Sequence, residues 1–91
     1  EFSNSIRWHF IDSLGKMYEQ DLIPKSKIIS FFHNFITQSK DLELNAAVVC
    51  VCMDIKLKEL YATIVHAFDN NKIQIDICGD LEDIEIALDM R

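Results

Sequence analysis

The chain has 91 residues, a net charge of −6 and a hydrophobic fraction of 49%, with only two glycines and one proline. These values predict one small, mostly helical domain and argue against a disordered chain. The acidic balance, with nine scattered Lys and Arg residues and no basic stripe, argues against a nucleic-acid partner and against an anionic membrane surface.

Residues 3–39 are predicted to form a first helical hairpin. In the helix expected over 3–19, apolar residues recur at helical spacing and form the stripe that we expect to be buried: Ile6, Phe10, Leu14 and Met17, widened by Trp8, Ile11 and Tyr18. Gly15 within this helix predicts the close approach of a neighbouring helix. Pro24 suits the first position of a second helix, because its missing N–H would be unpaired there anyway. The stripe of that helix is Ile28, Phe31, Phe32, Phe35 and Ile36.

Residues 41–70 are predicted to form a second hairpin around the most apolar stretch of the chain, Ala46 to Met53. Eight consecutive apolar residues offer no polar face to solvent, so we expect this segment at the buried centre. Its valines also suit a buried strand, and periodicity alone does not decide. We favour a helix over about 42–53, capped by Asp41, because the amphipathic helices on either side need a helical partner. A helix over about 57–70 follows and ends at Asn70-Asn71.

Within residues 72–79, the stretch 72–77 alternates strictly between polar and apolar side chains, a pattern typical of a strand. Because a lone strand is unstable, we expect an extended connector whose isoleucines pack under the helices. Gly79 ends this connector, and Asp80 caps a short terminal helix predicted over 81–89. Asp83 lies three residues after the cap, near the helix N-terminus, where negative charge is favourable.

The two hairpins resemble each other in sequence. A shift of about 33 residues aligns Asp21 with Asp54, Phe31 with Ile64 and Phe35 with Phe68. A repeated helix–turn–helix unit of this length is typical of an α-solenoid. The alternative is that any two amphipathic hairpins align somewhere by chance. We interpret the chain as an all-α domain of two antiparallel helical hairpins plus a short C-terminal helix.

Several motifs also point to a known family: Arg7-Trp8, Ser13-Leu14-Gly15, Asp21-Leu22-Ile23-Pro24, Glu59-Leu60-Tyr61 with Ala67-Phe68, and Cys78-Gly79-Asp80-Leu81-Glu82-Asp83-Ile84-Glu85. With these motifs the chain resembles a bacterial family of HEAT-like helical repeats, the domain-of-unknown-function family 1186. The resemblance covers nearly all of the chain and implies a HEAT-like α-solenoid fragment from the C-terminal half of the family's domain. The family has no established catalytic residues. Some members carry a Cys-rich zinc motif further on, which this chain does not contain.

Three cysteines and three histidines raise the possibility of a zinc site. On a helix, Cys50 and Cys52 are about 200° apart and cannot bind one ion, whereas on a strand they would share a face. Cys78 and a histidine would then complete the ligands. No CxxC or HxxxH spacing supports such a site, so we expect structural thiols and no metal or cofactor.

Catalytic signatures are missing from the sequence, and we predict that the protein is not an enzyme. There is no Gly-x-Ser-x-Gly elbow and no Gly-rich phosphate loop. Acidic residues gather near the C-terminus: Asp76, Asp80, Glu82, Asp83, Glu85 and Asp89. Helix capping and a solvated face explain them better than a cation site or a carboxylate pair.

The remaining global features predict a cytoplasmic protein that is part of a longer chain. No apolar run reaches the roughly 18 residues of a membrane span, and no signal peptide is visible. Three cysteines do not form the framework of a secreted disulfide-rich domain. The sequence starts at Glu1-Phe2 without a methionine, so we expect a truncated N-terminal edge.

The candidate protein-contact residues are Trp8, Phe31, His33 and His66. Phe31, beside Phe32, widens its stripe beyond what one neighbouring helix covers, and Trp8 lies near the N-terminal edge. His33 and His66 occupy the same position in the two units, so we expect them on adjacent helices, as a titratable patch or as polar-edge residues. We predict a non-catalytic scaffold for a protein partner, with a possible dimer through the N-terminal edge. The alternative is a Cys/His metal-binding accessory domain.

Overall fold

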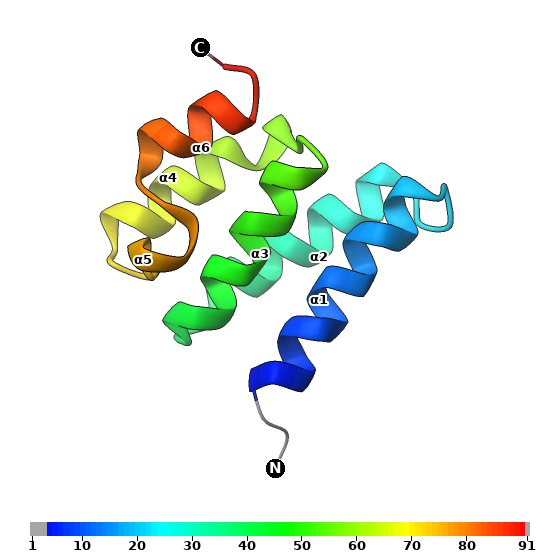
Figure 1. Cartoon of the computed structure of the whole chain (residues 1–91), viewed down its shortest axis with the longest axis horizontal. Coiled ribbons are helices and arrows are strands. Elements are labelled where there is room, and N and C mark those ends of the chain that lie inside the picture. The colour runs from blue at the N-terminus through cyan, green and yellow to red at the C-terminus, as the bar shows by residue number, and fades with distance from the viewer. Residues whose placement is uncertain (1–3, 91) are drawn as a thin grey trace.

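The computed structural model describes residues 4–90, so Ser3, where the first hairpin was expected to begin, lies outside the described residues. The helices are α1 (Asn4–Glu19), α2 (Lys25–Gln38), α3 (Leu42–Asp54), the 3-10 turn η1 (Lys58–Leu60), α4 (Tyr61–Asp69), α5 (Ile75–Cys78) and α6 (Leu81–Ala87) (Figure 1). No strand occurs between residues 4 and 90. The all-α prediction is confirmed.

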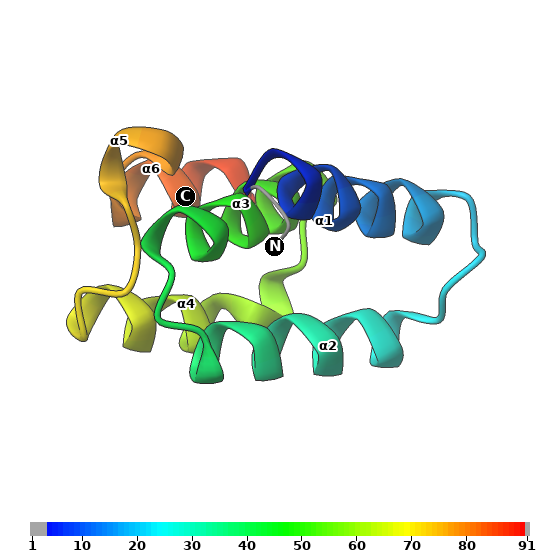
Figure 2. The ribbon, with the colours of Figure 1, turned by 90° about the horizontal axis from the view of Figure 1, so that it is seen from below.

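The helices lie in two layers. α1, α3 and α6 form one layer, and α2 and α4 pack side by side in the other (Figure 2). Each hairpin therefore contributes one helix to each layer: α1 and α2 from the first, α3 and α4 from the second. In the part of the chain that the structure describes, no helix is long and apolar enough to cross a membrane.

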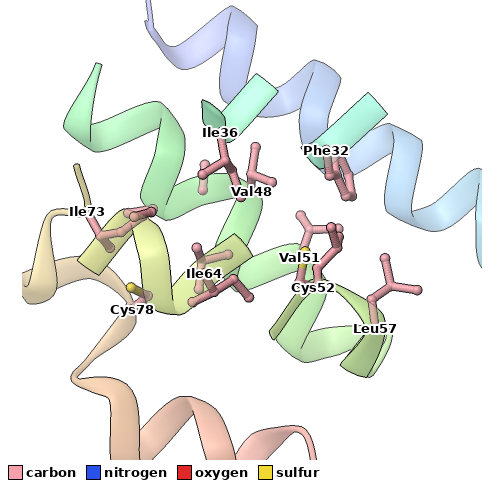
Figure 3. Packing of buried hydrophobic residues seen from close by; sticks show 14 of the residues in the cluster. Phe32, Ile36, Val48, Val51, Cys52, Leu57, Ile64, Ile73 and Cys78 are labelled. Carbon is pink, nitrogen blue, oxygen red and sulfur yellow. The ribbon is translucent and has the colours of Figure 1, made fainter. Parts of the chain in front are cut away.

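α3 is the centre of the core, and the prediction of a helix rather than a strand is confirmed. Val48 and Val49 are fully buried, and the cluster around them includes Phe32, Ile36 and Ile64 from the second layer (Figure 3). The Asp41 side chain accepts a hydrogen bond from the Leu44 N–H at 3.0 Å, as expected of an N-cap.

The polar Asn45 is also buried in α3. Its Nδ2 donates to the carbonyl oxygens of Ser39 at 3.1 Å and Lys72 at 3.0 Å. These bonds join the chain just before α3 to the chain just after α4, because a buried amide must find hydrogen-bond partners within the protein.

The predicted buried stripe of α1 is correct in part: Ile11 is buried and Trp8, Leu14 and Tyr18 are half-buried against the core, but Ile6, Phe10 and Met17 are exposed. Ile6 and Phe10 are 57% and 56% exposed, whereas Ile11 and Gly15 are buried. A Cβ added to Gly15 would lie 2.5 Å from Cγ1 of Val51, so the predicted close approach at this glycine is confirmed, and the neighbour is α3. That approach turns the Ile11 and Gly15 side of α1 inward and leaves the other apolar side in solvent.

Residues 75–78 of the predicted extended connector form the helical turn α5 instead. The Gly79 N–H donates to the Ile75 carbonyl at 2.7 Å, and α5 packs against α3. Ile73 is buried as expected, but Ile75 is exposed, because a helical turn does not keep the two-residue period of a strand.

Other helix ends differ from the predictions by one or two residues. Pro24 precedes α2 rather than opening it, with its carbonyl accepting from the Lys27 and Ile28 N–H groups. The fourth predicted helix is divided into η1 and α4, and the terminal helix ends at Ala87. The turn after α4 has Asn71 at a positive φ of 56°, as its sequence predicts.

Candidate functional site

Apolar side chains from α1 and α2 form an exposed surface at the end of the molecule away from α6. We call it the α1–α2 apolar face and define it by these residues: Ile6, Phe10, Leu14, Phe31 and Phe35. Ile6, Phe10 and Phe31 are exposed, and Leu14 and Phe35 are half-buried. In a small folded domain such surface is commonly covered by another protein surface.

Phe31 is the centre of this face. Its ring contacts three others, with centroid distances of 6.5 Å to Phe10, 5.9 Å to Phe32 and 6.4 Å to Phe35. The Phe10 contact is edge-to-face and joins α1 to α2. Phe31 nevertheless remains 43% exposed, so its neighbours fix the ring in place while one side of it faces solvent.

Two grooves flank Phe31. One has a volume of about 280 Å³ and is lined by Ile6, Arg7, Phe10, Ile11, Phe31 and Phe35. The other has a volume of about 240 Å³ and is lined by Leu14, Ile23, Lys27, Ile28 and Phe31. Phe31 is therefore the wall that both grooves share.

Each groove contains one basic residue and no acidic residue. Arg7 lines the first groove and Lys27 the second, and both are exposed. Neither makes a salt bridge with any residue that the structure describes, in contrast to Lys16 with Asp12 and Lys25 with Glu59. The site therefore combines an apolar surface with two positive charges that make no salt bridge within the described part of the chain.

The four predicted contact residues do not form one site. Phe31 is at the centre of the apolar face, as described above. Trp8 is half-buried and packs against the core, on the side of α1 that faces away from Ile6 and Phe10. The two histidines lie elsewhere, on α2 and α4, and line neither of the two grooves.

The histidines lie on adjacent helices, as the repeat predicted, but each bonds to a different partner. His33 Nδ1 and Thr63 Oγ1 are hydrogen-bonded at 2.8 Å, across the α2–α4 contact. Asn70 Nδ2 donates to His66 Nδ1 at 3.0 Å and to the His66 carbonyl at 2.8 Å. His33 therefore connects two helices, while His66 helps to end α4.

The cysteines behave as buried thiols. Burial raises the pKa of Cys52 to about 12 and the pKa of Cys78 to about 11, so both are protonated at neutral pH and weakly nucleophilic. Cys50 is half-exposed, and its Sγ lies 3.9 Å from the Ile77 carbonyl oxygen. Between residues 4 and 90, no group of three or more His, Cys, Asp or Glu side chains is placed to hold a metal ion.

Sequence reasoning missed Ile6 and Phe10 as part of the apolar face because it assigned them to the core. Gly15 was the signal that could have corrected this assignment. A glycine at a helix contact marks the side that faces its neighbour, and Ile6 and Phe10 do not lie on that side. Arg7 and Lys27 carried no sequence signal, because unpaired cations are common on any surface.

The sequence was compared with known proteins. The model of a family described as "Protein of unknown function (DUF1186)" matches residues 1–91. The resemblance inferred from the motifs is confirmed. No curated protein and no solved structure matches the chain.

Proposed function

We propose that this chain, which belongs to the DUF1186 family of proteins of unknown function, is a non-catalytic helical-repeat module that binds a protein partner. The observation that carries the proposal is Phe31, which is held by three aromatic neighbours and yet 43% exposed between two apolar grooves. Aromatic residues held in this way are typical anchors of protein interfaces.

A HEAT-like arrangement of the two hairpins is part of this proposal. It is supported by the two layers, to which each hairpin contributes one helix, and by the similarity at a spacing of about 33 residues. In that alignment Phe31 corresponds to Ile64, which is fully buried. In a helical repeat, equivalent positions of successive units contact successive neighbouring units. Phe31 therefore occupies a position on which a neighbouring unit or a partner surface would pack.

The properties of the grooves favour a protein partner over a small molecule. Each contains a single polar side chain, whereas small-molecule sites typically use several placed polar groups to orient a ligand. Apolar side chains from a partner surface fit such grooves better. We further propose a cytoplasmic location, which the three free cysteines support.

The proposal is tested by photo-crosslinking in cells that produce the protein. The photoreactive residue p-benzoylphenylalanine replaces Phe31 in one variant and Ala62, an exposed residue of α4, in a control. We expect a discrete adduct from position 31 alone, and its loss when Phe10→Glu is added. Identical adducts from both positions, or no discrete adduct from position 31, would contradict the proposal.

A further inference from the structure

The net charge of the chain is concentrated at one end. Residues 75–90 contain six acidic residues and no Lys or Arg, so this segment alone carries a charge of −6. The other 75 residues contain nine acidic and nine basic residues and are neutral as a set. The charged segment contains α5 and α6, which lie on the side of the molecule away from α1 (Figure 1).

The exposed side of α6 combines this negative charge with an apolar residue. Ile84 and Leu88 are buried under the helix, which leaves Ile86 55% exposed on the other side. We call this surface the α6 edge and define it by these residues: Glu82, Asp83, Ile86, Asp89 and Met90, all of them exposed. Helix capping explains Asp83, whose carboxylate accepts the Asp80 N–H in the capping box of α6. Capping does not explain why the exposed Ile86 lies among acidic residues.

We propose that the partner of the α1–α2 apolar face is a second copy of this chain, which binds through its α6 edge. This inference rests on the function proposed above and names the partner of that same site. In the contact, Ile86 of one copy packs beside Phe31 of the next. The acids around Ile86 then lie near Arg7 and Lys27, the two basic residues that line the grooves.

The charges favour a contact between an apolar face and an α6 edge over a contact between two α6 edges or between two apolar faces. Two α6 edges would bring together two segments that each hold six acidic residues, of which Asp89 is paired with Lys56, and like charges that are forced together disfavour a contact. Two apolar faces would bring the Arg7 and Lys27 residues of both copies together. Only the unlike pairing places acidic residues against basic ones.

The layer arrangement fits the same pairing. α1, α3 and α6 lie in one layer, with α1 and α6 at its two ends (Figure 2). Packing α6 of one copy against α1 of the next continues that layer with another helix–helix contact. Because the two surfaces differ, the contact is heterologous and leaves one free face and one free edge on each assembly.

Sedimentation equilibrium of the 91-residue chain, from micromolar to millimolar concentration, tests the inference. We expect the wild type to associate reversibly beyond a dimer, and more weakly as salt screens the charges. Phe31→Glu, which blocks the face, and Ile86→Glu, which blocks the edge, should each reduce association at least about tenfold. Leu22→Glu also replaces an exposed apolar residue that lines neither groove, so it should leave association unchanged. Circular dichroism shows that each variant is folded.

A mixture of the two blocked variants gives the sharpest result. Phe31→Glu keeps an intact α6 edge and Ile86→Glu keeps an intact apolar face, so together they should form a one-to-one dimer that grows no further. An Ile86→Glu protein that still dimerises alone would show a symmetric face-to-face contact and overturn the inference. A wild type that stays monomeric would also overturn it, and a crosslink from position 31 to a different protein would then leave the proposed function standing.

Discussion

Gly15 and Val51 determine how closely α1 approaches α3. The glycine is buried, and the valine methyl group occupies the space that a side chain at position 15 would need. This contact selects the side of α1 that faces the core, and so it also selects the side that becomes the α1–α2 apolar face. A single residue without a side chain thereby places the candidate site in solvent.

Gly15→Ala should destabilise the protein by about 1–3 kcal/mol through overpacking, even though alanine favours a helix over glycine by up to about 1 kcal/mol. Val51 is β-branched and cannot easily rotate away. In a Val51→Ala background the crowding is gone, so Gly15→Ala should become neutral or stabilising. A double-mutant cycle by urea unfolding measures this coupling. If Gly15→Ala destabilised the wild type and the Val51→Ala variant equally, the contact with Val51 would not limit how closely α1 packs against α3.

Val48 tests the central position of α3. The residue is fully buried, so Val48→Asp places an unpaired charge in the core and should cost about 4 kcal/mol or more, enough to unfold a domain of this size. Ala62→Asp, on an exposed position of α4, should cost less than about 1 kcal/mol. Thermal and urea unfolding compare the two. A cooperative transition of Val48→Asp near the wild-type midpoint would be inconsistent with this core.

The thiol of Cys52 makes stability depend on alkaline pH. Burial raises its pKa from 9.0 to about 12, so above pH 9 the unfolded chain loses this proton before the folded protein does. The free energy of unfolding should therefore fall between about pH 9 and 12, by at most about 1.4 kcal/mol per pH unit for this one group.

Urea unfolding at several pH values, compared between variants, isolates that contribution. Cys52→Ala should lose this part of the slope, whereas Val49→Ala, an equally buried truncation on α3, should keep it. If both variants show the wild-type slope, other groups cause the alkaline loss of stability.

At the scale of elements, α6 is a short helix that is held at both ends. At its start, Asp83 N–H donates to the Asp80 side chain at 3.0 Å, and the Asp80 N–H donates back to the Asp83 carboxylate at 3.3 Å, the reciprocal pair of a capping box. At its end, Lys56 Nζ lies 3.2 Å from the Ala87 carbonyl oxygen and 3.0 Å from the Asp89 carboxylate. These bonds hold the two ends of the helix that carries Ile86 of the proposed α6 edge.

Asp80→Ala should cost about 1 kcal/mol, because it removes the N-cap acceptor of a helix with few other contacts of its own. Asp80→Asn keeps an acceptor oxygen in the same place and should cost much less. Urea unfolding gives both values. Equal losses from the two variants would show that the negative charge of Asp80 matters rather than its hydrogen bond.

At the scale of the whole molecule, α3 joins the elements into one unit. It contacts α1 and α6 within its layer, α2 in the other layer, and α5 at its side. Removing α3 would leave α1 with few contacts, so the two hairpins should not unfold separately.

Trp8 provides the test of this cooperativity, because it is the single tryptophan of the chain and lies in α1. Its fluorescence and the far-UV circular dichroism of the whole chain should give the same urea midpoint. A fluorescence transition at clearly lower urea would mean that α1 detaches before the rest unfolds, and that the α1–α2 apolar face exists for only part of the time.

The parts of this protein that depend on local chemistry could be predicted from the amino-acid sequence. Eight consecutive apolar residues must be buried wherever they pack, so α3 could be placed at the centre without a structure. The caps at Asp41 and Asp80, and the end of α4 at Asn71, follow from side-chain and backbone preferences that act within a few residues. Gly15 likewise indicated a helix contact before its neighbour was known.

Which apolar surface of α1 stays exposed depends on contacts between helices that are distant in the sequence. α1 has apolar residues on two sides, and its helical period fits either as the buried one, so the approach of α3 at Gly15 made the choice. The same holds for residues 75–78, whose alternation suggests an extended chain until contact with α3 favours a helical turn. The exposure of Phe31 and the pairing of His33 with Thr63 were also beyond sequence reasoning, because both depend on where residues distant in the chain come to lie.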